Sequence, residues 1–218
     1  MVITAVPDVL FLFDFGSPNA YLAHRLIPGI EMRTGVRIQY FPILLGGLFK
    51  LTGNQSPASA FANIPSKLAY ERVEAERFIG RHNLHEFRWN PHFPVNTLAL
   101  MRGAVAAHAE GVFEAYTAAV FHFMWEEPRK LGDPSVLAAS LTQAGLPVDR
   151  LLARAQDKDV KDRLMANTQV AFERGAFGAP SFFVGDQLYF GKDRLREVED
   201  VLALEAACLH AADSINPG

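Results

Sequence analysis

The pattern of hydrophobic and polar positions at the start of the chain predicts a strand, a helix and a second strand. Residues 9–15 are almost all apolar, which is typical of a central strand that is covered on both faces. Ser17 and Pro18 then provide a helix start, and an amphipathic pattern continues to Gly35. Residues 36–44 alternate enough to form a second strand. This part of the chain therefore predicts a right-handed β-α-β unit.

The middle of the chain has a different pattern. Residues 53–66 are rich in turn formers, and a helical pattern of mixed charge follows from Lys67 to His82. After an aromatic segment that Pro91 interrupts, five further helical patterns lie at about 96–110, 112–126, 134–144, 148–155 and 158–174. No internal repeat is present, so we interpret this region as a compact helical block.

Strand character returns near the C-terminal end. Residues 181–184 and 187–190 predict a hairpin that turns at Gly185-Asp186. Asp193 is a suitable cap for a final helix, from Arg194 onwards to about residue 211.

The order of the predicted elements defines the expected fold class. It is β-α-β, then the helical block, then α-β-β-α. This is the order of an α/β thioredoxin-like domain with an all-helical domain inserted in its middle. We assign residues 1–45 and 175–218 to the thioredoxin-like domain and residues 46–174 to the insert.

Composition and charge exclude several classes of partner. The net charge of -3 over 218 residues does not suggest binding to nucleic acid or to an anionic membrane. No apolar run approaches membrane-spanning length, and the first residues do not resemble a signal peptide. The single cysteine, Cys208, cannot form an intramolecular disulfide and is expected to be buried and inert. We therefore expect a cytoplasmic protein.

Candidate chemistry begins where the first predicted strand meets the first helix. Thioredoxin-like redox proteins carry Cys-x-x-Cys at this junction, with the first sulfur at a helix N-terminus that lowers its pKa. Here the two positions are Ser17 and Ala20, which cannot form a disulfide. A hydroxyl beside the free N–H groups of a helix start suits the binding of a thiolate from another molecule. The simpler alternative is that Ser17 is only a helix cap.

Three segments in order carry a family resemblance. They are FDFGSPNAYLA near the start, Gly53-Asn54-Gln55 with Pro65-Ser66-Lys67 in the middle, and FGAPSFFVGDQLYFGKDRL near the end. With these segments the chain resembles the thioredoxin-like group of 2-hydroxychromene-2-carboxylate isomerases and kappa-class glutathione transferases, a branch of the DsbA-like fold. The resemblance implies that glutathione is bound without a redox cysteine.

The resemblance also implies a set of residues that bind glutathione. Ser17 would hydrogen-bond the sulfur and is the expected catalytic residue. Pro180 would follow a cis peptide bond and face the first helix, and the backbone of Ala179 would pair with the cysteinyl part of the tripeptide. Asp193 would bind the α-amino group, near Lys192. Lys192 departs from the small polar residue that kappa-class transferases have at that position.

Two residues of the predicted insert complete this set. The resemblance implies that Asn54 and Lys67 contact the tripeptide or a substrate carboxylate. For Lys67 the simpler alternative is a solvated lysine at a helix start. The histidines at positions 82, 85 and 92 lack the spacing of a helix-face metal pair, so we expect no metal site.

The function implied is a glutathione-dependent isomerase. It would convert 2-hydroxychromene-2-carboxylate to trans-o-hydroxybenzylidenepyruvate in the degradation of aromatic compounds, or act on a related small aromatic carboxylate. Two alternatives stay open: a kappa-like glutathione transferase, and a non-catalytic module that binds glutathione or a peptide. The absence of paired cysteines disfavours a thiol-disulfide oxidoreductase. The resemblance further implies a homodimer.

Overall fold

A four-stranded mixed sheet forms the centre of the computed structural model, which describes the backbone of residues 8–215 and the side chains up to Glu205. The strand order is β2-β1-β3-β4, with β1 parallel to β2 and antiparallel to β3. The strands are β1 (Val9–Phe13), β2 (Gln39–Pro42), β3 (Ser181–Val184) and β4 (Gln187–Phe190). The structure therefore confirms the predicted β-α-β unit and the C-terminal hairpin.

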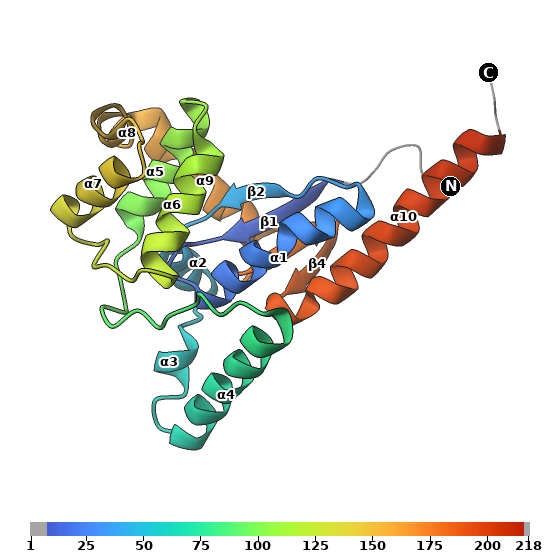
Figure 1. Cartoon of the computed structure of the whole chain (residues 1–218), viewed down its shortest axis with the longest axis horizontal. Helices are drawn as coiled ribbons and strands as arrows, with labels where there is room; N and C mark the ends of the chain where they lie inside the picture. Colours follow the sequence, from blue (N-terminus) through green and yellow to red (C-terminus); the bar gives the residue numbers. More distant parts are fainter. Residues whose placement is uncertain (1–7, 216–218) are drawn as a thin grey trace.

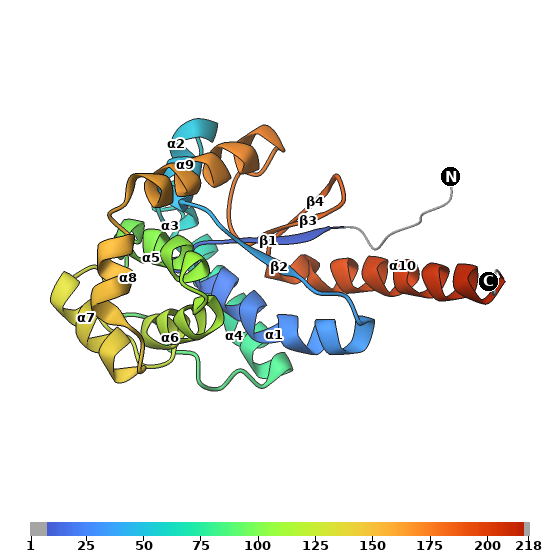
Figure 2. The ribbon, with the colours of Figure 1, turned by 90° about the horizontal axis from the view of Figure 1, so that it is seen from above.

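Helices cover both faces of this sheet. Figure 2 shows α1 (Pro18–Thr34) and α10 (Leu195–Ile215) on one face, and α2 (Leu45–Thr52) and α9 (Lys158–Glu173) on the other. Phe11 and Phe13 belong to the core on the α1 side, whereas Leu12 packs with residues of α2 and α9. Because successive side chains of a strand point to opposite faces, burial on both sides explains the unbroken apolar run of β1.

The remaining helices form two groups. In Figure 1, α5 to α8 gather beside one end of the sheet, whereas α3 and α4 extend away from them. These helices are α3 (Pro57–Ala60), α4 (Pro65–His82), α5 (Leu98–Ala109), α6 (Phe113–Trp125), α7 (Pro134–Gln143) and α8 (Val148–Arg154). One hydrophobic core runs from the sheet into α5 and α6 without interruption. The boundaries assigned to the inserted domain stay a prediction.

Several element boundaries differ from the predicted ones. β1 ends at Phe13, because Asp14 to Gly16 form a turn before the helix, and β2 covers only Gln39–Pro42. The helix α2 was not predicted, since its sequence contains Gly46 and Gly47, and its packing against α9 outweighs their low helix propensity. The short helix α3 likewise interrupts the predicted loop.

The predicted role of Asp193 as a helix cap is wrong. Asp193 lies inside a short 3₁₀ turn (Lys192–Arg194), and α10 begins after that turn, at Leu195. Both oxygens of the Asp193 carboxylate accept hydrogen bonds from Lys192 instead of from the backbone of the helix.

Within the described residues, no helix is both long and apolar enough to cross a membrane. The expected burial of Cys208 concerns a side chain outside the described part of the chain.

Candidate functional site

Ser17 lies at the N-terminus of α1, as predicted. Its Oγ accepts a hydrogen bond from the Ala20 N–H at 3.1 Å, which caps the helix. The same oxygen donates to the main-chain carbonyl of Ala179 at 2.9 Å. The side chain is almost fully buried, with 5% of the residue exposed. Ser17 is therefore both a helix cap and a link to the loop that precedes β3.

The loop that faces Ser17 contains the predicted cis-proline. The Ala179–Pro180 peptide bond is cis, which confirms the prediction. The Pro180 carbonyl accepts the Gly191 N–H at 2.9 Å, so the loop is tied to the end of β4. A Cβ at Gly178 would come within 2.7 Å of the Phe190 ring, and glycine is therefore needed where this ring covers the loop.

Asn54 lies against the same loop. Its Nδ2 donates to the carbonyl of Phe177 at 2.8 Å, two residues before Ala179. Its Oδ1 accepts the N–H of Gln55 at 2.8 Å, which fixes the orientation of the amide. The structure thus brings Asn54, Ala179 and Ser17 together, although Asn54 lies 37 positions after Ser17 in the sequence and Ala179 lies 125 positions after Asn54.

Lys192 and Asp193 follow the end of β4, which is hydrogen-bonded to the cis-proline loop. Gly191, which bonds to the cis-proline loop, directly precedes them. Lys192 is 5% exposed, and its Nζ donates to the two oxygens of Asp193 at 2.8 and 3.0 Å. The Asp193 side chain is 60% exposed, so its carboxylate can meet a ligand from solvent.

Lys67 is not joined to the other predicted residues. It lies in the first turn of α4, and its Nζ is 3.4 Å from the centre of the Phe61 ring, a cation–π contact. Within the described part of the chain, no hydrogen bond or ion pair links Lys67 to another residue of the predicted site. Its predicted role in binding stays a prediction.

Sequence reasoning did not single out Asp14, which supports the segment before Ser17. Asp14 is 1% exposed and accepts hydrogen bonds from the N–H groups of Gly16 and Leu45 and from the Thr97 hydroxyl, at 2.9, 2.9 and 3.1 Å. Burial raises the pKa of the Asp14 carboxyl, while these three hydrogen bonds oppose that effect. The feature of the sequence that could have indicated this role is the position of Asp14, a polar residue at the end of an apolar strand.

Two side chains of the helical block also hold this segment. The indole Nε1 of Trp125 donates to the Phe15 carbonyl at 2.8 Å, and the Phe15 N–H lies 3.4 Å from the sulfur of Met101. Trp125 is 1% exposed and belongs to the hydrophobic core. The turn that carries Ser17 is thus fixed by contacts from α5 and α6.

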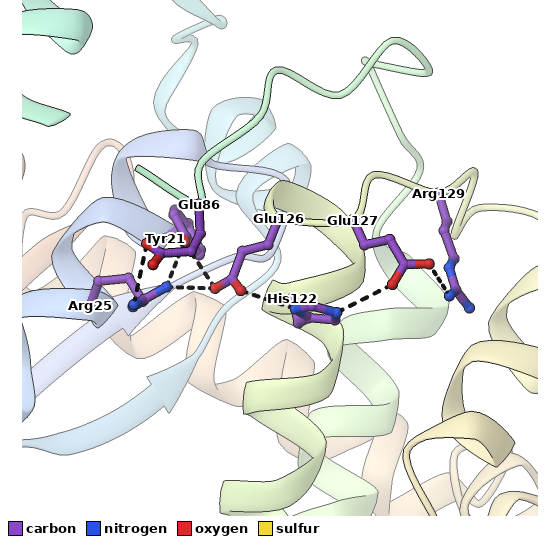
Figure 3. A network of polar contacts seen from close by, with 7 residues as sticks. All are labelled: Tyr21, Arg25, Glu86, His122, Glu126, Glu127 and Arg129. Atoms are coloured by element: carbon purple, nitrogen blue, oxygen red, sulfur yellow. Dashed lines mark hydrogen bonds and ion pairs between the residues drawn. The ribbon is translucent and has the colours of Figure 1, made fainter. Parts of the chain in front are cut away.

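A polar network further connects α1 to α6 (Figure 3). Arg25 donates to the hydroxyl of Tyr21 at 3.0 Å and to Glu126 at 2.7 Å, and Tyr21 donates to Glu126 at 2.9 Å. Burial alone would raise the pKa of Glu126, but hydrogen bonds from His122 and Tyr21 and the charge of Arg25 outweigh it and lower the pKa. The network continues through Glu86, Glu127 and Arg129.

Two cavities of the protein lie away from these residues. One of about 520 Å³ borders β2, α5 and α9, and another of about 200 Å³ lies between α1 and the start of α10. Neither is lined by Ser17, Asn54 or the cis-proline loop. Among the side chains of residues 8–205, no group of three or more His, Cys, Asp and Glu could hold a metal ion.

Fold and site together define a class of protein. The cis-proline loop facing the N-terminus of α1 is the arrangement of a thioredoxin-like protein, and a serine occupies the position of the first redox cysteine. The family model of the DSBA-like thioredoxin domain matches residues 8–203. The chain therefore belongs to the DSBA-like thioredoxin family.

Individual relatives are similar over most of their length. A 2-hydroxychromene-2-carboxylate isomerase from Sphingobium xenophagum is 29% identical over 88% of this chain and 96% of its own. Glutathione S-transferase kappa 1 from Homo sapiens is 24% identical over 89% of this chain and 90% of its own. A solved structure of a 2-hydroxychromene-2-carboxylate isomerase superposes with a TM-score of 0.75 at 28% identity, covering 94% of this chain and 98% of the other. The resemblance found in the sequence is thus confirmed.

Proposed function

We propose that this protein is a glutathione-dependent isomerase of 2-hydroxychromene-2-carboxylate or of a related small aromatic carboxylate. The observation that carries the proposal is the position of the Ser17 hydroxyl, at a helix N-terminus and 2.9 Å from the carbonyl of Ala179. The similarity to proteins named 2-hydroxychromene-2-carboxylate isomerase supports the reaction. The similarity to kappa-class transferases supports the use of glutathione.

The residues around Ser17 fit a thiolate. A free thiol has a pKa of about 8.5 and is mostly protonated near neutrality. The positive end of α1 and the hydroxyl of Ser17 both favour the anion, and no acidic residue lies in the first turn of α1 to oppose them. Lowering the thiol pKa by about 2 would make most of it thiolate and corresponds to about 2.7 kcal/mol.

A change of hydrogen-bond partner would prepare the site for its ligand. The Ser17 hydroxyl donates to the Ala179 carbonyl, and rotation about its Cβ–Oγ bond would direct the proton to the sulfur instead. This rotation would free the Ala179 carbonyl to accept an N–H from the cysteinyl part of the tripeptide, as in the pairing of two strands. The protein would thus replace one internal hydrogen bond by two bonds to glutathione.

The other residues would bind and orient. Asp193 would accept the α-ammonium group of the tripeptide, and Asn54 would hold the cis-proline loop through Phe177. Bound glutathione would supply a thiolate for reversible addition to an unsaturated carbon of the substrate: once the ring has opened, the former double bond could rotate as a single bond, and elimination would restore it and release the thiolate. It would be regenerated in each cycle, so it acts as a cofactor and is not consumed.

The proposal is tested by measuring substrate turnover together with the amount of glutathione that remains. The purified protein is mixed with 2-hydroxychromene-2-carboxylate, with and without glutathione, and both the isomer and the free thiol are measured. We expect isomerisation only with glutathione and no loss of thiol. Loss of thiol in step with substrate would support a transferase, which the 24% identity to the kappa-class enzyme keeps as the second candidate. Binding of glutathione without turnover of this substrate would indicate a non-catalytic module or a different substrate.

A further inference from the structure

Lys192 is a charged residue whose side chain is enclosed beside the candidate site. The residue is 5% exposed, although lysine is rarely buried unless it is paired. Its Nζ contacts Asp193 on one side and the Glu74 carboxylate of α4 at 3.5 Å on the other. The ring of Phe78, also on α4, lies 4.7 Å from Nζ. These contacts hold the ammonium group between Asp193 and the side chains of α4.

Through these contacts Lys192 acts on the neighbouring residue, Asp193. Because Nζ donates to both oxygens of Asp193, it fixes the rotamer of a carboxylate that is otherwise 60% exposed. A fixed carboxylate binds a cation without losing further side-chain entropy.

The same contacts fasten α4 to the site. Within the described residues, only Ala75 and Phe78 of this 18-residue helix are buried, so α4 has few other attachments (Figure 1). Phe78 and Glu74 are two of those attachments, and both reach Lys192. Since Lys67 lies on the same helix, the position of Lys67 depends in part on this ion pair.

We propose that Lys192 is a positioning residue, which orients Asp193 toward the γ-glutamyl ammonium group of glutathione and holds α4 beside it. The inference rests on the proposed function, because it takes glutathione as the ligand. It assigns Lys192 no direct contact with the ligand. Removing Lys192 would increase the negative charge of the site, but solvent screens an exposed carboxylate, so the loss of orientation dominates.

The experiment compares two ligands that differ only at the ammonium group. Glutathione and γ-glutaryl-cysteinylglycine, which lacks the α-amino group, are titrated calorimetrically into the wild-type protein and into Lys192→Met. Methionine keeps an apolar chain over Phe78 but has no charge. We expect glutathione to bind about fivefold more weakly to the variant and the analogue to change less than twofold.

Three further variants test whether the loss of glutathione affinity comes from the contact between Lys192 and Asp193. Lys192→Met should cause no further loss of glutathione affinity in an Asp193→Asn background, because the two residues act through one contact. Lys192→Gln, which retains a donor, should lose less than Lys192→Met and serves if the methionine variant does not fold. Lys158→Met removes an exposed lysine that pairs with Asp162 and is the control.

The outcomes separate this inference from the proposed function. An equal loss for both ligands would mean a direct contact or a general structural effect and would overturn the inference. Unchanged glutathione binding in Lys192→Met would also overturn it, while glutathione-dependent turnover would remain intact. If the wild-type protein bound neither ligand, the proposed function itself would fail.

Discussion

The hydroxyl of Ser17 donates a 2.9 Å hydrogen bond to the carbonyl of Ala179, a residue 162 positions later in the chain. The bond joins the N-terminus of α1 to the cis-proline loop, the two parts that together form the candidate site. A redox relative would place a sulfur at this point. The contact therefore identifies Ser17 as the residue whose replacement tests the proposed chemistry most directly.

Ser17→Ala should slow isomerisation more than it weakens glutathione binding. The variant loses one hydrogen bond to a charged sulfur, which is worth about 1.5–3 kcal/mol and corresponds to roughly a ten- to hundredfold loss in the affected step. The dipole of α1 and the other binding residues remain, so some activity should survive. The thiolate absorbance of bound glutathione should titrate at a higher pH in the variant than in the wild-type protein.

The chain offers a matched control for the loss of the helix cap. Ser56 caps α3 in the same Ser-Pro context, and its Oγ accepts the Ser59 N–H at 3.2 Å. Ser56→Ala should leave both turnover and the thiol titration unchanged. If Ser17→Ala behaved like this control, Ser17 would be a helix cap without a catalytic role.

Asn54→Ala should raise the KM for glutathione about three- to tenfold with little change in kcat. The amide of Asn54 holds the carbonyl of Phe177, and its loss would loosen the cis-proline loop that pairs with the ligand. The neighbouring exposed residue provides the control, Gln55→Ala. A fall in kcat at unchanged KM would contradict a role in binding and would assign Asn54 to the chemical step.

Trp125→Phe should destabilise the protein by about 2 kcal/mol. The change removes the hydrogen bond from Nε1 to the Phe15 carbonyl and leaves that buried carbonyl without its partner. Urea unfolding measures the effect, and kcat should fall as the turn before Ser17 loosens. Trp89→Phe alters the other tryptophan, which is 43% exposed, and should cost much less. Equal costs for the two variants would show that the buried hydrogen bond adds little.

The sequence predicted the strands and most helices because their signals are local. Pro18 and Gly35 mark the ends of α1, and residues 181–190 carry both strands of the hairpin with their turn. By contrast, α2 contains Gly46 and Gly47 and depends on packing against α9, which is more than 100 residues away. A local pattern cannot contain that information.

The candidate site likewise contains some residues whose positions the sequence predicts and others whose positions it does not. Ser17 and Pro180 lie in recognisable motifs, and their predicted positions agree with the structure. The support from Asp14 and Trp125 consists of contacts between distant segments, which no spacing in the sequence reveals. The direction of the Lys192 side chain could not be predicted either, because it depends on how α4 packs.

The stability of the protein should fall between neutral pH and pH 5 because of His24. Burial, with the nearby charge of Arg25, lowers the pKa of His24 to about 4. Its Nδ1 lies 2.7 Å from the Tyr40 hydroxyl, and its ring stacks on Phe121 at 4.7 Å. In the unfolded chain the pKa is about 6.5, so between these two values the unfolded state binds a proton that the folded state does not.

The free energy of unfolding should therefore decrease as the pH falls from about 6.5 towards 4. The full difference corresponds to about 3 kcal/mol, of which about 2 kcal/mol is lost at pH 5. His24→Gln removes this titration, so urea unfolding at pH 7.5 and pH 5 should show a smaller difference for the variant than for the wild-type protein. His85→Gln, at an exposed histidine, is the control for the loss of a histidine. Equal differences in the wild-type protein and His24→Gln would assign the acid sensitivity to other groups.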